Sequence, residues 1–414
     1  MGKIDFEKFT LNNGLKVIVH HDASTPLVCL NIMYDVGSRD ENPERTGFAH
    51  LFEHLMFGGS ANIPSYDSPL QTAGGSNNAF TSPDITNYYI TLPKENLETA
   101  FWLESDRMLN LAFSDKSLEV QRNVVIEEFR QRYLNQPYGD AWLLMRPLAF
   151  KEHSYQWATI GKEEKHIEEA TMADVRAFYK KHYRPKNAVM VVAGNITTEE
   201  VKVLSEKWFE PIEKGEKPPR NIPVEPVQTE ARRLEVERDV PLNAIYISFH
   251  MCGKMNDDFF KWDLISDLLA GGKSSRLQQK LVKENRIFTS ISAFVMGETD
   301  PSLFTVAGHI SPDKTIAEAE EAIWAELELF KTHKVAKIEL EKVKNQVEAN
   351  HEFAEMDLLN RAIGLAYHEL KGEANDINTE MEKYHAVTAN DVQKIATESL
   401  IKSNSSTLVY NRKK

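Results

Sequence analysis

The pattern of apolar and polar positions along the chain predicts an α+β protein. Short runs rich in β-branched and aromatic residues are typical of strands, and they occur at residues 16–21, 27–34, 86–92, 187–194, 244–251, 302–310 and 406–411. Elsewhere apolar residues recur at intervals of three and four, which predicts helices at residues 96–111, 117–132, 172–183, 316–331 and 335–353. Strands and long helices therefore alternate along the chain.

A proline-rich segment divides the sequence into near halves. Residues 211–235 combine prolines with charged residues, a composition typical of an extended linker. The halves also resemble each other, because residues 55–60 match residues 268–273 and the strands predicted before these segments match as well. We therefore predict two homologous domains, residues 1–210 and 236–414, each with helices packed on a mostly antiparallel sheet.

The stretch from His50 to His54 reads His-Leu-Phe-Glu-His and predicts a metal site. Residues four apart on a helix lie on one face, so His50 and His54 can place two imidazole nitrogens on a single ion. Glu53 shares this face and can take a proton from a water held on the metal. This spacing is the inverted form of a familiar zinc-peptidase motif. Apolar residues flank the motif, which argues against an ordinary solvated helix face.

Two imidazoles leave a catalytic zinc ion one protein ligand short. The predicted helix 117–132 offers Glu127 and Glu128, and adjacent helical residues point about 100° apart, so only one of them can face the metal. In the second half, His50, Glu53 and His54 fall on Asp263, Ser266 and Asp267, which cannot reproduce the site. Only the first half is expected to carry the chemistry.

Composition narrows the classes of partner. The formal net charge of -13 at pH 7 disfavours nucleic acid, which normally binds a basic surface. Cys29 and Cys252 lie far apart, so neither a disulfide framework nor a thiolate zinc site is indicated. The N-terminus lacks a signal-like apolar run and no stretch is long enough to span a membrane, so a cytoplasmic location is expected.

The chain resembles the M16 (pitrilysin/insulinase) metallopeptidases over essentially its whole length. It is most similar to the half-length branch that includes the mitochondrial processing peptidase β subunit and many bacterial peptidases. The matching segments are residues 11–17, 36–41, 50–59, 78–81, 84–89 and 124–128. The resemblance implies the LuxS/MPP-like metallohydrolase fold and a third metal ligand at Glu128, with Glu127 as the alternative.

The resemblance also implies a mechanism. One Zn²⁺ per chain, held by His50, His54 and Glu128, would activate water for hydrolysis of peptides or unfolded segments, with Glu53 as general base. Asn78 and Ala79 are the expected substrate contacts, because in the family this strand pairs with an extended substrate. In the family two such chains close as a clamshell around a chamber.

Two departures from the family pattern lie near the third ligand. The interval between His54 and Glu128 is slightly shorter than usual, which a loop deletion would explain. Gln121 stands where the family has a second acidic residue, seven positions before Glu128. Gln121 lies two turns away on the same helical face and could still support Glu128 through a hydrogen bond.

A third departure concerns an Arg/Tyr pair that the family places in its second half, after a Ser-Ser-Arg-Leu turn. Aligned from that turn, the Arg position is Val282 and the Tyr position is Thr289, while Arg276 and Arg286 are out of register. We therefore predict a heterodimer whose sister chain supplies the pair, with a homodimer as the simpler alternative. A non-catalytic structural subunit is the alternative function, although such members typically lose the His-x-x-Glu-His residues.

Overall fold

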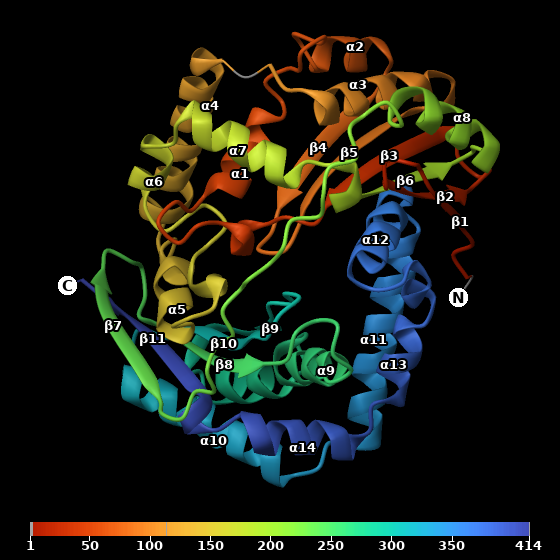
Figure 1. Ribbon diagram of the computed structural model, residues 1–414. Helices are drawn as coiled ribbons and strands as arrows, with labels where there is room; N and C mark the ends of the chain where they lie inside the picture. Colours follow the sequence, from red (N-terminus) through yellow and green to blue (C-terminus); the bar gives the residue numbers. More distant parts are fainter. Residues whose placement is uncertain (1–2, 113, 414) are drawn as a thin grey trace. The chain divides into compact units, whose positions relative to one another are not determined.

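A computed structural model describes residues 3–112 and 114–413, which form two compact units (Figure 1). Unit 1 combines the chain up to Phe129 with Trp157–Ile222 and His351–Thr379. Unit 2 combines Arg130–Gln156, Pro223–Asn350 and the chain from Glu380 onward. Each unit is thus assembled from three separate stretches of chain.

Unit 1 is built on a six-stranded sheet with the order β1-β2-β6-β3-β5-β4. Its strands are β1 (Glu7–Thr10), β2 (Lys16–His21), β3 (Leu27–Tyr34), β4 (Ser76–Thr81), β5 (Thr86–Pro93) and β6 (Ala188–Gly194). The β2–β6 pair is parallel and every other pair is antiparallel. Strand β6 is buried at all of its positions, as expected of a central strand.

Unit 2 repeats this topology in a five-stranded sheet with the order β7-β11-β8-β10-β9. Its strands are β7 (Arg232–Arg238), β8 (Ala244–Met251), β9 (Phe288–Val295), β10 (Ser302–Ile310) and β11 (Ser405–Arg412). The β7–β11 pair is parallel and the others are antiparallel. Strand for strand, this is the order β2-β6-β3-β5-β4 of unit 1, so the predicted duplication is visible in the fold.

Helices surround both sheets. Those of unit 1 are α1 (Phe48–Leu55), α2 (Asp67–Thr72), α3 (Leu97–Leu109), α4 (Asp115–Phe129), α6 (Glu164–Glu168), α7 (Met172–His182), α8 (Thr198–Trp208) and α12 (Leu358–Lys371). Those of unit 2 are α5 (Ala141–Ala149), α9 (Phe259–Ala270), α10 (Ile316–Thr332), α13 (Glu380–Ala386) and α14 (Ala389–Ser399). Helix α11 (Lys337–Glu355) begins in unit 2 and ends in unit 1.

Each sheet receives a helix from the opposite half of the chain. Helix α12 packs on β3 and β6 of unit 1, where Ala362, Leu365 and Ala366 join a core with Cys29 and Met33. In unit 2, α5 packs on β7, β8 and β11. The compact units therefore interleave along the sequence, whereas the prediction from sequence divides the chain once, at the linker. The division into two contiguous domains, residues 1–210 and 236–414, stays a prediction.

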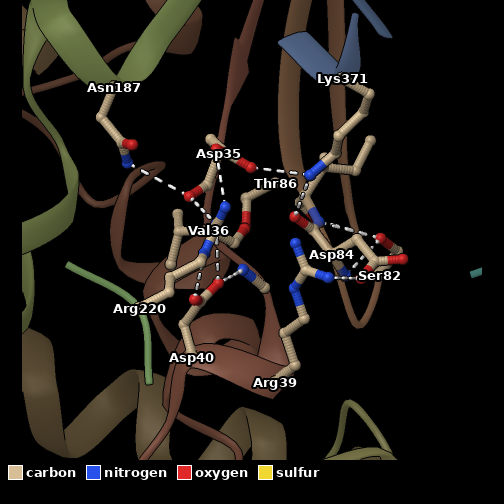
Figure 2. A network of polar contacts seen from close by, with 12 residues as sticks. Asp35, Val36, Arg39, Asp40, Ser82, Asp84, Thr86, Asn187, Arg220 and Lys371 are labelled. Atoms are coloured by element: carbon tan, nitrogen blue, oxygen red, sulfur yellow. Dashed lines mark hydrogen bonds and ion pairs between the residues drawn. The ribbon is translucent and has the colours of Figure 1, made fainter. Parts of the chain in front are cut away.

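A buried polar network ties three distant segments of unit 1 together (Figure 2). Asp35, just after β3, accepts hydrogen bonds from Lys371 at the end of α12 and from Arg220, each at 2.7 Å. Burial alone would raise the pKa of Asp35, but these two cations hold it well below its usual range. Asp35 therefore stays ionised and anchors both α12 and the first part of the linker.

The α+β fold with two mostly antiparallel, helix-covered sheets is confirmed. Residues 213–229 belong to no helix or strand, and β7 begins at Arg232, so the last residues of the predicted linker 211–235 already belong to a sheet. The linker itself stays a prediction. Across the described residues, no helix has the length and apolar character needed to cross a membrane.

Candidate metal centre

Helix α1 places the motif side chains on its less buried face. The residues that anchor the helix are all buried, namely Phe48, Ala49, Leu51, Phe52 and Leu55. The ring of Phe52 packs 4.7 Å from that of Tyr183, just beyond α7. His50, Glu53 and His54 are only half-buried. The apolar face packs the helix against the rest of unit 1, and the side chains of the polar face lie outside the core and can bind a metal ion.

A buried carboxylate holds the start of α1. Glu41 accepts hydrogen bonds from the backbone N–H groups of Gly47 at 2.9 Å and Ala49 at 2.8 Å. The indole N–H of Trp157 also donates to Glu41, at 3.1 Å. Burial raises the pKa of Glu41 to about 8, while these three donors favour its charged form. Glu41 therefore acts as an N-terminal cap supplied from outside the helix.

Glycine is required at the turn into α1. Gly47 has φ 87°, a left-handed conformation that side chains rarely adopt. A Cβ atom there would also lie 2.6 Å from the carbonyl oxygen of Ile160. This turn sets the direction in which α1 leaves the preceding loop.

Helix α4 brings Glu128 to the two histidines of α1. The Oε2 atom of Glu128 lies 3.7 Å from Nε2 of His50 and 3.4 Å from Nε2 of His54. The three potential ligand atoms all lie within 4.8 Å of one another, and no other group of three such side chains occurs among residues 3–112 and 114–413. Ligand atoms about 2.0 to 2.1 Å from a tetrahedral zinc ion are separated by about 3.4 Å, so this cluster has a suitable size.

The neighbouring acidic residue, Glu127, is not part of this cluster. Glu127 is exposed, whereas Glu128 is half-buried and its side chain is 17 % exposed. Adjacent positions on α4 thus face different surroundings, as the helical geometry requires. Gln121 is half-buried on the same helix. Its support of Glu128 stays a prediction.

Glu53 lies beside the end of the edge strand β4. The hydroxyl group of Thr81, the last residue of β4, donates a hydrogen bond to Oε2 of Glu53. Glu53, the predicted base, therefore belongs to α1 and also contacts β4 through Thr81.

Strand β4 contains the predicted substrate contacts, Asn78 and Ala79. It is the last strand of its sheet and, within the described part of the chain, pairs with β5 alone. Asn78 is exposed and Ala79 is half-buried. The strand therefore leaves one backbone edge available for another extended chain. Contact of Asn78 and Ala79 with substrate stays a prediction.

Sequence reasoning did not single out Glu41 or Thr81 as functional residues. Glu41 and Thr81 are the last residues of the segments 36–41 and 78–81. These segments resemble the family, but the resemblance assigned no role to either residue. A glutamate a few residues before Gly47, the glycine that precedes α1, was the available signal for the cap. The contact between Thr81 and Glu53 joins residues 28 positions apart and had no local signal.

Comparison with known proteins identifies the family. The profile of Insulinase (Peptidase family M16) matches residues 16–143, and that of the Peptidase M16 inactive domain matches residues 169–347. A Zinc protease PqqE of Helicobacter pylori is 32% identical over 344 residues, covering 82% of this chain and 77% of that protein. The chain belongs to peptidase family M16. The predicted family and enzyme class are confirmed at this level.

Other proteins similar to this M16 chain are proteases by name or share its fold. An uncharacterized zinc protease, YmxG of Bacillus subtilis, is 25% identical over 347 residues, covering 83% of each protein. The crystal structure of a protease from Helicobacter pylori superposes with a TM-score of 0.92 at 28% identity, covering 98% of this chain and 99% of that one. Pitrilysin shares the fold, with a TM-score of 0.78 at 19% identity, and this chain covers 45% of it.

Among the described residues of this M16 chain, unit 2 has no cluster equivalent to His50, His54 and Glu128. Helix α9 follows β8 as α1 follows β3, and it carries Asp263 and Asp267 one turn apart. Asp263 accepts a hydrogen bond from the hydroxyl of Tyr384 at 2.6 Å. The absence of a metal motif agrees with the inactive-domain profile that covers α9.

Proposed function

We propose that this protein is a zinc-dependent endopeptidase that cleaves peptides or unfolded segments of polypeptide. The observation that carries the proposal is the cluster of His50, His54 and Glu128, with Glu53 on the same helix. The names of the relatives as zinc proteases support the same assignment.

The donor set fits zinc. Two imidazole nitrogens and one carboxylate are a known ligand set of catalytic zinc sites, in which a fourth position stays open for water or substrate. When bound, zinc would supply Lewis acidity that lowers the pKa of a water molecule and polarises a carbonyl group. His50 and His54 would hold it from α1, and Glu128 from α4.

Glu53 would transfer the proton during hydrolysis. Its carboxylate would take a proton from the attacking water and deliver it to the leaving amine. Strand β4 would hold the substrate, because an extended peptide can add to its unpaired edge through backbone hydrogen bonds. Such binding depends little on side chains, so unfolded segments of varied sequence are the expected substrates.

The test combines metal analysis with a cleavage assay. The wild-type protein should contain about one zinc per chain and cleave a mixed peptide library, and chelation should remove both properties until zinc is restored. Glu53→Gln should retain zinc but lose roughly 100-fold or more in turnover, because an amide cannot accept the proton. Glu44→Gln, at an exposed neighbouring position, is the matched control. Near-normal turnover of Glu53→Gln would exclude Glu53 as the base.

We further propose a heterodimer with an M16-like sister chain. At the two positions where the family has its Arg/Tyr pair, Val282 packs against the core of unit 2 and Thr289 bonds to the carbonyl of His309. Arg276 is engaged in a bidentate ion pair with Glu339. None of these residues provides the missing pair, which supports supply by a partner.

The partner proposal can be tested by activity. The chain alone should cleave peptides slowly, and the M16-like protein that co-purifies from native cells should increase the rate. A homodimer that cleaves at full rate without any such partner would overturn this proposal. The assignment of the zinc site would be unaffected.

A further inference from the structure

The β4–β5 hairpin is held in a fixed position beside α1. In its turn, the backbone N–H of Ser82 bonds to the carbonyl of Ile85 at 2.9 Å, and the Ser82 hydroxyl accepts bonds from Asp84 and Ile85 at 3.1 Å each. In the strands, Thr81 lies opposite Thr86, whose hydroxyl donates to the carbonyl of Val36 at 2.9 Å. The hairpin end therefore has little conformational freedom.

The segment 38–41 anchors the hairpin. Arg39 forms a buried ion pair with Asp84 at 3.0 Å, and its backbone N–H bonds to the carbonyl of Pro83 at 3.0 Å. Figure 2 shows Arg39 and Asp84 side by side. Gly37, just before this segment, approaches so closely that a Cβ atom would lie 2.3 Å from the Pro83 oxygen.

The same segment anchors the helix that carries the base. Glu41 ends this segment and holds the N-terminus of α1 through Gly47 and Ala49. One short stretch of chain therefore fixes both Thr81, on the hairpin, and Glu53, on the helix. The hydrogen bond from Thr81 to Glu53 closes this arrangement.

We infer that Thr81 is a positioning residue for Glu53. A glutamate side chain loses considerable rotamer freedom when it is held in one orientation, and a fixed hydroxyl donor on Oε2 supplies that restraint before substrate binds. The inference rests on the proposed peptidase function. It adds that the strand proposed to bind the peptide also orients the base, so both requirements of the reaction depend on one hairpin.

Two substitutions separate the hydroxyl group from the shape of the side chain. Thr81→Val removes the hydroxyl and keeps the branched side chain, whereas Thr81→Ser keeps the hydroxyl. Thr10→Val is the matched control, because Thr10 is an exposed strand residue at the end of β1, at the opposite edge of the same sheet. For each variant, kcat, KM and zinc content are measured with one peptide substrate.

Thr81→Val should lower kcat by roughly 10-fold, a part of the full contribution of a general base, while KM changes by less than about twofold. Zinc content should stay at one per chain, and Thr81→Ser should recover kcat to within about threefold. Thr10→Val should match the wild type.

Three results would overturn the inference. They are an unchanged kcat in Thr81→Val, a kcat in Thr81→Ser as low as in Thr81→Val, and loss of zinc from Thr81→Val, which would mean a structural role. If instead the wild-type protein binds zinc but cleaves no peptide, the proposed function itself fails. The two failures are therefore distinguishable.

Discussion

Glu127 and Glu128 are adjacent on α4 but only Glu128 reaches the histidines. Glu128→Gln should weaken zinc affinity by roughly 10- to 100-fold or more, because a neutral amide is a poorer ligand than a carboxylate. Glu127→Gln has the same change of charge at an exposed position and should leave zinc affinity unchanged. Competition with a zinc-sensitive dye measures both variants. The reverse order would move the third ligand to Glu127.

At the scale of single residues, spacing along the sequence was sufficient to predict some residues of the candidate site but not others. His50, Glu53 and His54 could be proposed as one group because they lie on one helical turn, where sequence distance determines spatial distance. The roles of Glu41 and Thr81 depend on how separate segments meet in the fold. Sequence spacing carries no information about such contacts.

Asp267, in unit 2, should make the stability of the folded protein depend on pH. Burial, with a further contribution from the charge of Asp263, raises the pKa of Asp267 to about 6 from an ordinary value of 3.8. The folded state therefore binds more protons than the unfolded state between these values. Protonated Asp267 contributes its full stabilisation below about pH 4, and this is lost as the pH rises through about 6.

Asp267→Asn should remove this dependence. At pH 7.5 the variant should be more stable than the wild type by on the order of 1 kcal/mol, after discounting for solvent screening of a half-buried group. At pH 4 the two proteins should unfold at similar urea concentrations. Urea unfolding at both pH values, followed by tryptophan fluorescence, is the measurement. An equal difference at the two pH values would contradict the assignment.

At the scale of elements, the turn before α1 should be sensitive to substitution because it needs a glycine. Gly47→Ala should destabilise the protein by roughly 1 to 3 kcal/mol, because it combines a left-handed backbone with a contact to Ile160. It should also lower zinc affinity, since the helix must shift. Gly14→Ala is the control, because φ is 90° there but the nearest atom to a Cβ lies at 3.4 Å.

Gly14→Ala should reduce stability without changing zinc affinity. Thermal unfolding and zinc titration of the two variants provide the comparison. Equal zinc affinity in Gly47→Ala and Gly14→Ala would show that α1 does not depend on this turn.

The strands that the apolar pattern failed to predict share one property. Strands β1, β4, β7 and β9 are the edge strands of the two sheets. Their burial is incomplete, as in β4, where exposed and half-buried positions alternate. The central strands β3 and β6 are buried on both faces along nearly their whole length and consist almost entirely of apolar residues, so their boundaries could be predicted closely. The strand proposed to bind substrate was therefore invisible to the pattern for a physical reason.

At the scale of the whole molecule, each sheet depends on a helix from the other half of the chain. A fragment of residues 1–222 lacks α12, so the apolar sheet face around Cys29 and Met33 should be exposed. This fragment alone should bind a hydrophobic dye and no zinc. Co-expression with residues 223–414 should restore zinc binding, as measured on the purified complex. A fragment 1–222 that binds zinc alone would contradict this dependence.

Because each sheet packs against a helix from the other half of the chain, the order of folding during synthesis is also constrained. The sheet of unit 1 is complete once β6 has left the ribosome, but α12 follows only after Lys371 has emerged. At typical translation rates this interval lasts roughly ten to thirty seconds. Throughout it, an apolar sheet face lacks its cover while the next sheet is being made. A nascent chain of this protein is therefore expected to engage chaperones over this interval, and its first half cannot mature before nearly all of the second has been translated.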